Sequence, residues 1–249
     1  MKRALLLCSA ILMTISTTAH ATINLAWDDC GAAGTDTKRF ACDGNTGTPF
    51  SLIGSFIPSA QLNGVVAADA TILVIPSDTF PDWWKFGSAE CRGAMGLTSS
   101  FDFTFGPFTC ADPWSGQAFS AMTYELGYPD SAGARIRVQG AIGDGSTMME
   151  AGREYYVFKL NIARSRTTGA GACAGCATAV CLVLNDMTVY VNTNDSVTET
   201  SGNTAAYWHD AFIYIWDDFE HHRSGIGCAP GTPTETARST WGRVKSLYR

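Results

Sequence analysis

The cysteines constrain this chain more than any other feature of the sequence. An even number of cysteines in an exported chain is typical of a disulfide framework. Eight of them follow the first 21 residues, and we predict that they form four disulfides, although eight cysteines allow 105 pairings. They are Cys30, Cys42, Cys91, Cys110, Cys173, Cys176, Cys181 and Cys228.

Proximity in the sequence favours one arrangement of these bridges. Neighbouring cysteines pair first, and the last four then pair among themselves, where the choice of partners stays open. The Cys173-Ala174-Gly175-Cys176 motif lacks the second pair that zinc would need and the following helix of a redox motif, so we predict neither. The arrangement that we favour is Cys30–Cys42, Cys91–Cys110, Cys173–Cys181 and Cys176–Cys228.

Residues 1–21 have the parts of a secretory signal peptide. Lys2 and Arg3 precede a short apolar run, and Ala19-His20-Ala21 has the form of a cleavage site. The run is shorter than the ~20 apolar residues of a membrane-spanning helix. We therefore expect a secreted or extracellular protein that passes through the periplasm, with no membrane insertion after cleavage and one domain over residues 22–249.

The charge of the chain argues against a nucleic acid partner. Loss of Lys2 and Arg3 with the leader changes the formal net charge from −6 to −8. Acidic chains repel phosphate backbones, and the sequence has no cluster of lysines and arginines to bind them.

Alternation of apolar and polar residues, the pattern of half-buried strands, dominates the chain. About ten such runs, separated by Gly, Pro, Asn, Asp and Ser, predict an all-β, two-sheet β-sandwich with a jelly-roll-like arrangement. Trp241, Val244 and Leu247 recur at a spacing of three and predict a short C-terminal helix. The predicted strands are Ile23–Trp27, Ser51–Ile57, Thr71–Ile75, Phe101–Phe105, Ala118–Leu126, Arg135–Gln139, Tyr155–Ile162, Val180–Leu184, Met187–Val191 and Ala211–Trp216.

Several phrases of the sequence occur together in a way that points to a family. The first are Asn24–Gly31 (NLAWDDCG), Asp82-Trp83-Trp84 with Cys91-Arg92, and Glu154–Lys159 (EYYVFK). The others are Asn161-Ile162, Arg164-Ser165, Cys173–Cys176 (CAGC), Cys181–Asn185 (CLVLN) and Thr240–Arg249 (TWGRVKSLYR).

Together these phrases resemble a family of short, uncharacterised exported bacterial proteins. The resemblance spans nearly the whole mature chain and implies a stand-alone secreted β domain. It assigns no activity and no catalytic residue. The segment Trp208–His222 departs from the family pattern, which is shorter there and lacks the histidines.

Aromatic residues are the best binding candidates in the sequence. Flat rings on a rigid sandwich can stack on sugars, because they offer apolar area at little entropic cost. The alternative is that these rings only pack beneath loops. The candidate ligand-binding residues are Trp83, Trp84, Trp114 and Tyr124, with Tyr128 close by.

Acidic and histidine residues give weaker signals. Glu125, Asp130, Glu150 and Glu154 could supply a hydrolytic pair, but the sequence does not place two of them face to face. The cluster from His209 to His222 lacks metal-ligand spacing and is interpreted as the polar end of a surface hairpin. Asp28, Asp29, Asp144 and Asp195 lie in turns without a calcium-loop pattern, and Asp favours turns for its own backbone hydrogen bonds.

These observations favour a secreted, non-catalytic extracellular module that binds a carbohydrate or a cell-surface partner. We expect no cofactor and no metal, and the sequence has no G-x-S-x-G nucleophile motif. A structural component of the cell envelope or matrix and a secreted hydrolase are the alternatives.

Overall fold

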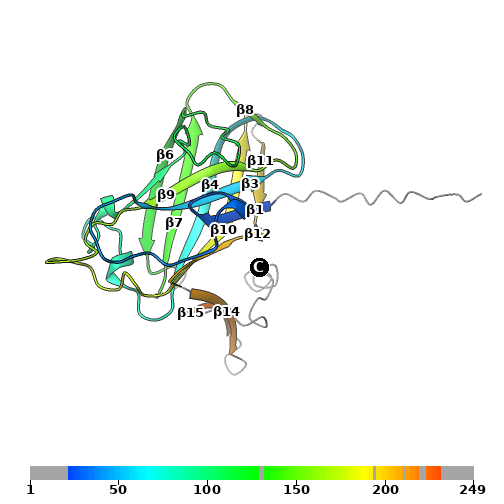
Figure 1. The fold of residues 1–249 in the computed structure, drawn as a ribbon. Helices are drawn as coiled ribbons and strands as arrows, with labels where there is room; N and C mark the ends of the chain where they lie inside the picture. The colour runs from blue at the N-terminus through cyan, green and yellow to red at the C-terminus, as the bar shows by residue number, and fades with distance from the viewer. Residues whose placement is uncertain (1–21, 129–131, 193–194, 210, 219–222, 231–249) are drawn as a thin grey trace, which may run out of the picture.

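Buried residues alternate with more exposed ones along Ala134–Ile142, whereas Phe50–Ile57 and Tyr155–Ile162 are buried over most of their length. The buried side chains form one core between two sheets that pack face to face. The computed structural model describes residues 22–128, 132–192, 195–209, 211–218 and 223–230. The predicted signal peptide and C-terminal helix lie outside these residues and stay predictions. Within the described residues the protein is an all-β sandwich, as predicted (Figure 1).

The smaller sheet, sheet A, has five strands. Its neighbouring strands are antiparallel, except that the short β12 runs parallel to β1. In spatial order the strands are β12 (Gly202–Asn203), β1 (Thr22–Trp27), β3 (Phe50–Ile57), β9 (Tyr155–Ile162) and β5 (Leu97–Ser100).

The larger sheet, sheet B, has eight strands. Six form its main path, while β11 (Asp195–Glu199) pairs with β10 and β8 (Thr147–Met149) pairs with β4. The path is β2 (Thr37–Lys38), β13 (Ala205–Trp208), β10 (Val180–Val191), β4 (Leu62–Pro76), β7 (Ala134–Ile142) and β6 (Ala118–Leu126). The chain crosses repeatedly between the sheets, as in a jelly roll.

A two-stranded hairpin adds a third element. It consists of β14 (Ala211–Asp218) and β15 (Arg223–Pro230). It packs on sheet B through Ala179, Cys181, Ala211 and Cys228. Since Val180 and Leu182 face the main core, Cys181 between them faces outward, and the hairpin covers one end of the outer face of sheet B.

Within the residues that the structure describes, helical structure is limited to three short 3₁₀ turns. These are η1 (Gly31–Ala33), η2 (Asp82–Trp84) and η3 (Ala94–Gly96). Among the described residues no helix is long and apolar enough to cross a membrane.

The core contains an aromatic cluster that we define as Trp27, Phe40, Phe50, Trp83, Trp84 and Trp208. Trp208 lies at its centre, with its ring 4.4–5.6 Å from the other five. Its indole N–H donates to the Cys176 carbonyl at 2.5 Å. The cluster therefore joins both sheets and the loop that contains η2.

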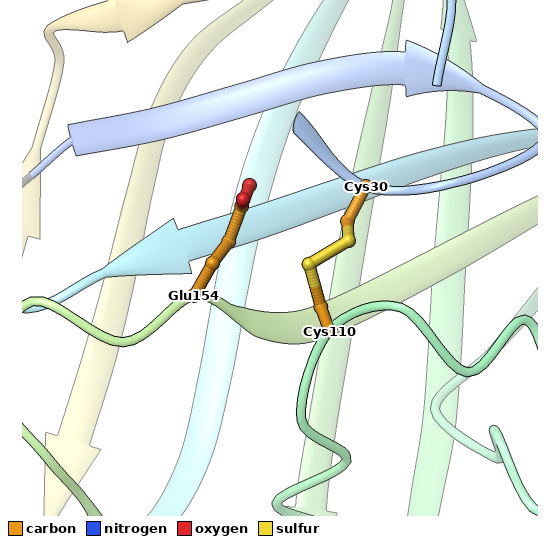
Figure 2. Close-up of side chains that lie close together, drawn as sticks. All are labelled: Cys30, Cys110 and Glu154. Atoms are coloured by element: carbon orange, nitrogen blue, oxygen red, sulfur yellow. A yellow bond between two sulfur atoms is a disulfide. The ribbon is translucent and has the colours of Figure 1, made fainter. Parts of the chain in front are cut away.

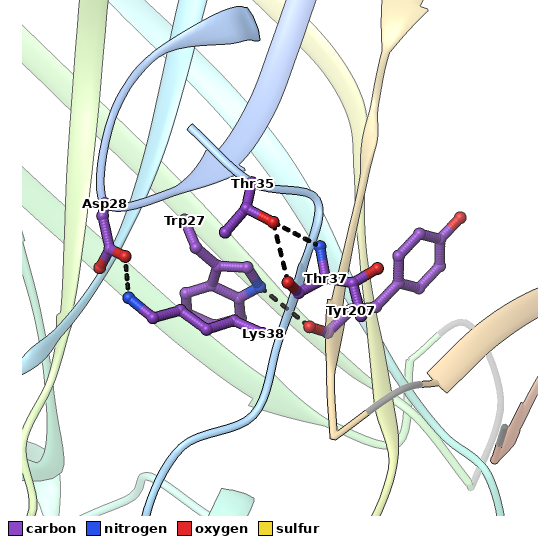
Figure 3. Close-up of polar contacts among 6 residues, drawn as sticks. All are labelled: Trp27, Asp28, Thr35, Thr37, Lys38 and Tyr207. Carbon is purple, nitrogen blue, oxygen red and sulfur yellow. Dashed lines mark hydrogen bonds and ion pairs between the residues drawn. The ribbon is translucent and has the colours of Figure 1, made fainter. Parts of the chain in front are cut away.

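Polar contacts fix the edge of this cluster where β1, β2 and β13 meet (Figure 3). The Trp27 indole N–H donates to the Tyr207 carbonyl at 3.0 Å. Lys38 pairs with Asp28, and the Thr35 hydroxyl donates to the Thr37 carbonyl at 2.8 Å. These contacts join β1 to β13 and to β2, and backbone hydrogen bonds pair β2 with β13.

All eight cysteines that we predicted to form disulfides do so, but each of the four pairings that we favoured is wrong. Three bridges join loops that are distant in the sequence, because the sandwich brings its loops together at the ends of the sheets, and the fourth joins strands β10 and β15. Cα–Cα distances of 5.8–6.4 Å suit the bond. The pairs are Cys30–Cys110, Cys42–Cys176, Cys91–Cys173 and Cys181–Cys228. The cysteines of the Cys173–Cys176 motif thus belong to two separate bridges.

Peptide mapping without reduction tests this connectivity. We expect cross-linked peptides that join Cys30 to Cys110 and Cys42 to Cys176, because their loops are adjacent in the fold. Mass spectrometry of a digest at acidic pH, where thiol exchange is slow, gives the pairs directly. Recovery of a Cys30–Cys42 peptide would contradict the structure.

One predicted strand, Phe101–Phe105, is wrong. Residues 101–105 form a loop, and the edge strand β5 precedes them. Phe101 and Phe103 are buried nevertheless, with the Phe103 ring stacked 4.5 Å from that of Tyr156. The loop inserts the rings of Phe101 and Phe103 into the core. Two buried rings separated by one residue give the same apolar pattern in the sequence as a strand.

Candidate functional site

The four aromatic residues predicted to bind a ligand lie in or against the core. Trp83 and Trp84 are 0% exposed and Trp114 is 1% exposed. Tyr124 is half-buried, its hydroxyl donates to the Trp84 carbonyl at 2.6 Å, and burial raises its pKa. This burial argues against the predicted sugar-binding role, and we assign the four side chains to packing.

Three contacts explain why the Trp83 ring is fixed. The Arg92 guanidinium lies 3.9 Å from one ring of Trp83, and Trp208 packs at 5.0 Å. The Trp83 indole N–H donates to the Thr167 hydroxyl at 3.0 Å. Burial lowers the pKa of Arg92 to about 10, and this cation is part of the core.

The carboxylates considered for hydrolysis do not form a facing pair among the described residues. Glu125 pairs with Arg135 at 2.5 Å, and Glu150 pairs with Arg153 at 3.3 Å. Glu154 lines an open pocket in which it is the one carboxylate among the lining residues. Most glycoside hydrolases need two across a cleft. Asp130 lies outside the described residues.

Metal-ligating residues gather at one place in the described part of the chain, at Cys30, Cys110 and Glu154. The two sulfur atoms are bonded to each other, and a disulfide offers no thiolate to zinc. This cluster is therefore not a zinc site (Figure 2).

Most residues of the predicted polar cluster around the histidines lie outside the part of the chain that the structure describes. Asp210, Glu220, His221 and His222 lie beyond the described residues. His209 is described, and its Nε2 lies 3.6 Å from the Cys42 sulfur. The interpretation as a surface hairpin end stays a prediction.

Three of the aspartates considered for calcium, Asp28, Asp29 and Asp195, contact other groups of the protein. Asp28 pairs with Lys38, and Asp29 Oδ1 accepts the Cys30 backbone N–H at 2.8 Å. Asp195 accepts the following backbone N–H at 2.8 Å. These contacts agree with the preference of Asp for turns.

The outer face of sheet B carries a row of residues that sequence reasoning did not single out. Strand register places Phe119 beside Ala141, Ala141 beside Ala67, and Ala67 beside Tyr190. We call these four residues the aromatic row. Phe119 is 75% exposed and Tyr190 is 37% exposed. Three strand spacings separate the two aromatic residues, or about 14 Å, with only alanine side chains between them.

A β-bulge turns Tyr190 toward this face. The register of β10 against β4 shifts between Leu184 and Asp186. Cys181 faces outward before the bulge, and an unbroken alternation would leave Tyr190 facing the core. The extra residue, Asn185, reverses the alternation, so that Asp186, Thr188 and Tyr190 share the outer face.

Polar side chains form the next row on the same face. Asp69 lies between Gln139 and Thr188 by register. The Tyr190 hydroxyl donates to Asp69 Oδ2 at 2.9 Å, and this hydrogen bond raises the pKa of Tyr190. The hairpin is bonded to sheet B at Cys181 and extends from the lower end of the sandwich (Figure 1). Nine residues of strand, about 30 Å, separate Cys181 from the aromatic row.

Comparison with known proteins adds little to this geometry. No family model matches the chain, and no curated protein matches it. Among solved structures it is weakly similar to a cohesin module from a Clostridium perfringens ATCC13124 family 33 glycoside hydrolase. The identity is 11%, the match covers 76% of this chain and 98% of that one, and the TM-score is 0.33. A similarity this low supports no statement about the function of the chain.

Proposed function

We propose that the protein is an exported, non-catalytic module that binds a carbohydrate on the outer face of sheet B. The observation that carries this proposal is the aromatic row, with Phe119 and Tyr190 exposed on either side of Ala141 and Ala67. Export is supported by the predicted signal peptide and by the four disulfides, which are typical of oxidising compartments.

The chemistry of the row suits a sugar. A sugar ring has an apolar face that packs on an aromatic ring and hydroxyls at its rim that need hydrogen-bonding partners. Asp69 and Gln139 supply such partners in the adjacent row, whereas Thr188 beside them is buried and its hydroxyl bonds to that of Thr198. Because these residues project from paired strands, the surface is ordered before the ligand arrives, which lowers the entropic cost of binding.

The charges on this face favour a neutral glycan. Register places Arg137 between Thr71 and Thr123, one row beyond Asp69 and Gln139. Asp69 and Arg137 are therefore close neighbours of opposite sign. A face with mixed charges gives no net field to attract a polyanion such as nucleic acid.

Alanine substitution of the two exposed rings tests the proposal. We expect Phe119→Ala and Tyr190→Ala each to weaken glycan binding by at least about tenfold, because each removes an apolar contact of about 1.5–3 kcal/mol. A glycan array with the mature protein identifies the ligand, and calorimetry with the best neutral glycan measures the change.

The matched control is Met95→Ala. Met95 is also exposed, at 80%, but it lies in η3 before the edge strand of sheet A. This variant should bind as the wild type does. No binding to any glycan by the wild type, or unchanged binding by both ring variants, would rule out the proposed function.

A further inference from the structure

An open pocket of about 600 Å³ lies on the other side of the sandwich, over sheet A. Two loops line it, one after β1 and one between β5 and β6. The Cys30–Cys110 disulfide joins these loops (Figure 2). Glu154, which precedes β9, points its carboxylate into the space beside this disulfide. Phe108, Thr109 and Arg153 also line the pocket.

The Glu154 carboxylate is held firmly by neutral donors. Its Oε1 accepts hydrogen bonds from the Asn24 amide at 2.7 Å and from the Ser55 hydroxyl at 2.6 Å. The backbone at Gly31 passes so close that a Cβ there would come within 2.4 Å of both carboxylate oxygens. The carboxylate therefore has little freedom to move.

The carboxylate has no cationic partner within the described residues. None of their lysines or arginines lies within ion-pair distance of Glu154. Arg153 is its neighbour, but its guanidinium is 3.3 Å from Glu150 and lies over the ring of Tyr155. A half-buried anion with neutral donors on one oxygen is a ready acceptor for an external cation.

A second carboxylate, that of Asp29, does not line the pocket but bonds to Thr109, which does. Asp29 Oδ1 accepts the Tyr156 hydroxyl at 2.6 Å, and Asp29 Oδ2 accepts the Thr109 hydroxyl at 2.5 Å. Tyr156 in turn accepts the backbone N–H groups of Thr109 and Cys110 at 2.9 and 3.1 Å. These bonds fix the loop that carries Phe108, whose ring is 78% exposed.

From this arrangement we infer that the pocket binds a primary ammonium group. Because Oε1 already accepts two hydrogen bonds, Oε2 is left for the ligand. One free oxygen suits a compact ammonium better than a guanidinium, which prefers both oxygens at once. The exposed Phe108 ring offers a cation–π contact at the mouth. Such a group occurs in deacetylated amino sugars and in lysine side chains.

Titration calorimetry with two pairs of probes tests the inference on the full mature protein. One pair is a glucosamine oligosaccharide and its N-acetylated counterpart, and the other is a short lysine peptide and its Nε-acetylated counterpart. We expect the free amine of at least one pair to bind and its acetylated form not to bind. The pair that binds identifies the source of the ammonium.

Two variants localise the binding to this pocket. Glu154→Gln keeps an oxygen for Asn24 and Ser55 but removes the charge, and should weaken amine binding by about tenfold to a hundredfold. Phe108→Ala removes an exposed ring and should weaken it by about two- to fivefold. Glu90→Gln, which removes a carboxylate elsewhere, should change nothing.

The inference is independent of the outer face of sheet B, so Phe119→Ala should leave amine binding intact. Melting curves show whether Glu154→Gln is folded; if it is not, Phe108→Ala, whose ring is outside the core, decides. No amine binding by the wild type, equal binding of the acetylated probes, or amine binding unchanged in the folded variants would overturn it.

Discussion

Replacing Cys42 and Cys176 together with alanine is expected to lower the free energy of unfolding by about 2–5 kcal/mol. This bridge joins residues 134 apart in the sequence, the longest separation of the four. In the chain-entropy model its loss therefore releases the most freedom in the unfolded state. Cys176 also accepts the Trp208 indole N–H through its carbonyl, so the bridge holds a loop against the aromatic cluster.

Calorimetric melting of the purified variant measures this loss. At about 2–4 °C per kcal/mol for a chain of this size, the melting temperature should fall by roughly 5–20 °C. The matched control is the pair Cys181→Ala and Cys228→Ala, which spans 47 residues and joins the hairpin to β10. That pair should release the hairpin to proteolysis with a smaller effect on the sandwich. An equal fall in both variants would contradict the unequal roles that we assign.

Trp208→Ala is the second substitution for which we expect a large effect. The ring contacts five other aromatic rings and is 0% exposed. Removing a buried aromatic side chain of this kind costs about 3–5 kcal/mol, since the neighbours cannot fill the cavity. The Cys176 carbonyl would also lose its donor. Chemical denaturation monitored by circular dichroism gives the change directly.

Two controls separate packing from loss of the hydrogen bond. Trp208→Phe keeps an aromatic ring and should lose less stability than Trp208→Ala. Phe119→Ala removes a ring that is 75% exposed, and should change stability by no more than about 0.5 kcal/mol. If Trp208→Ala were as stable as Phe119→Ala, the position of Trp208 in the core would be wrong.

Strands were predictable where apolar and polar residues alternate in the sequence. Tyr155–Ile162 has the predicted bounds, and Ala118–Leu126 does as well. The runs Val180–Leu184 and Met187–Val191 are one strand, β10, divided by the bulge at Asn185. The sequence pattern changes phase there because the chain itself does. Residues 62–70 of β4 were missed, since their small side chains alternate only weakly.

Disulfide pairing could not be predicted from proximity in the sequence. Cys30 and Cys42 are close along the chain, but Cys30 lies in a loop that faces the β5–β6 connection. Cys42 instead lies beside the loop before β10. Which loops meet depends on the order of the strands in the two sheets, and no local pattern encodes that order.

The candidate sites also depend on the order and register of the strands, which the sequence does not show. Alternation within Met187–Val191 puts Tyr190 on the other face of the strand from Met187 and Val189, and the structure has it there. Only the register of four strands brings Phe119 into line with Tyr190. Glu154 was recognised as a carboxylate of interest, but its position beneath Gly31 follows from a loop closed by a distant cysteine.

The order of the bridges has a consequence for biogenesis. Cys181 and Cys228 are the one disulfide pair with no other cysteine between them in the sequence. The other three pairs interleave or nest along the chain. As a chain emerges from its N-terminal end into an oxidising compartment, Cys42 becomes available to Cys30 long before Cys110 does. An oxidase that joins thiols as they appear would therefore trap a non-native bridge between them. On the export route that we propose, maturation of this protein calls for thiol–disulfide exchange, by which an isomerase replaces early bridges with native ones.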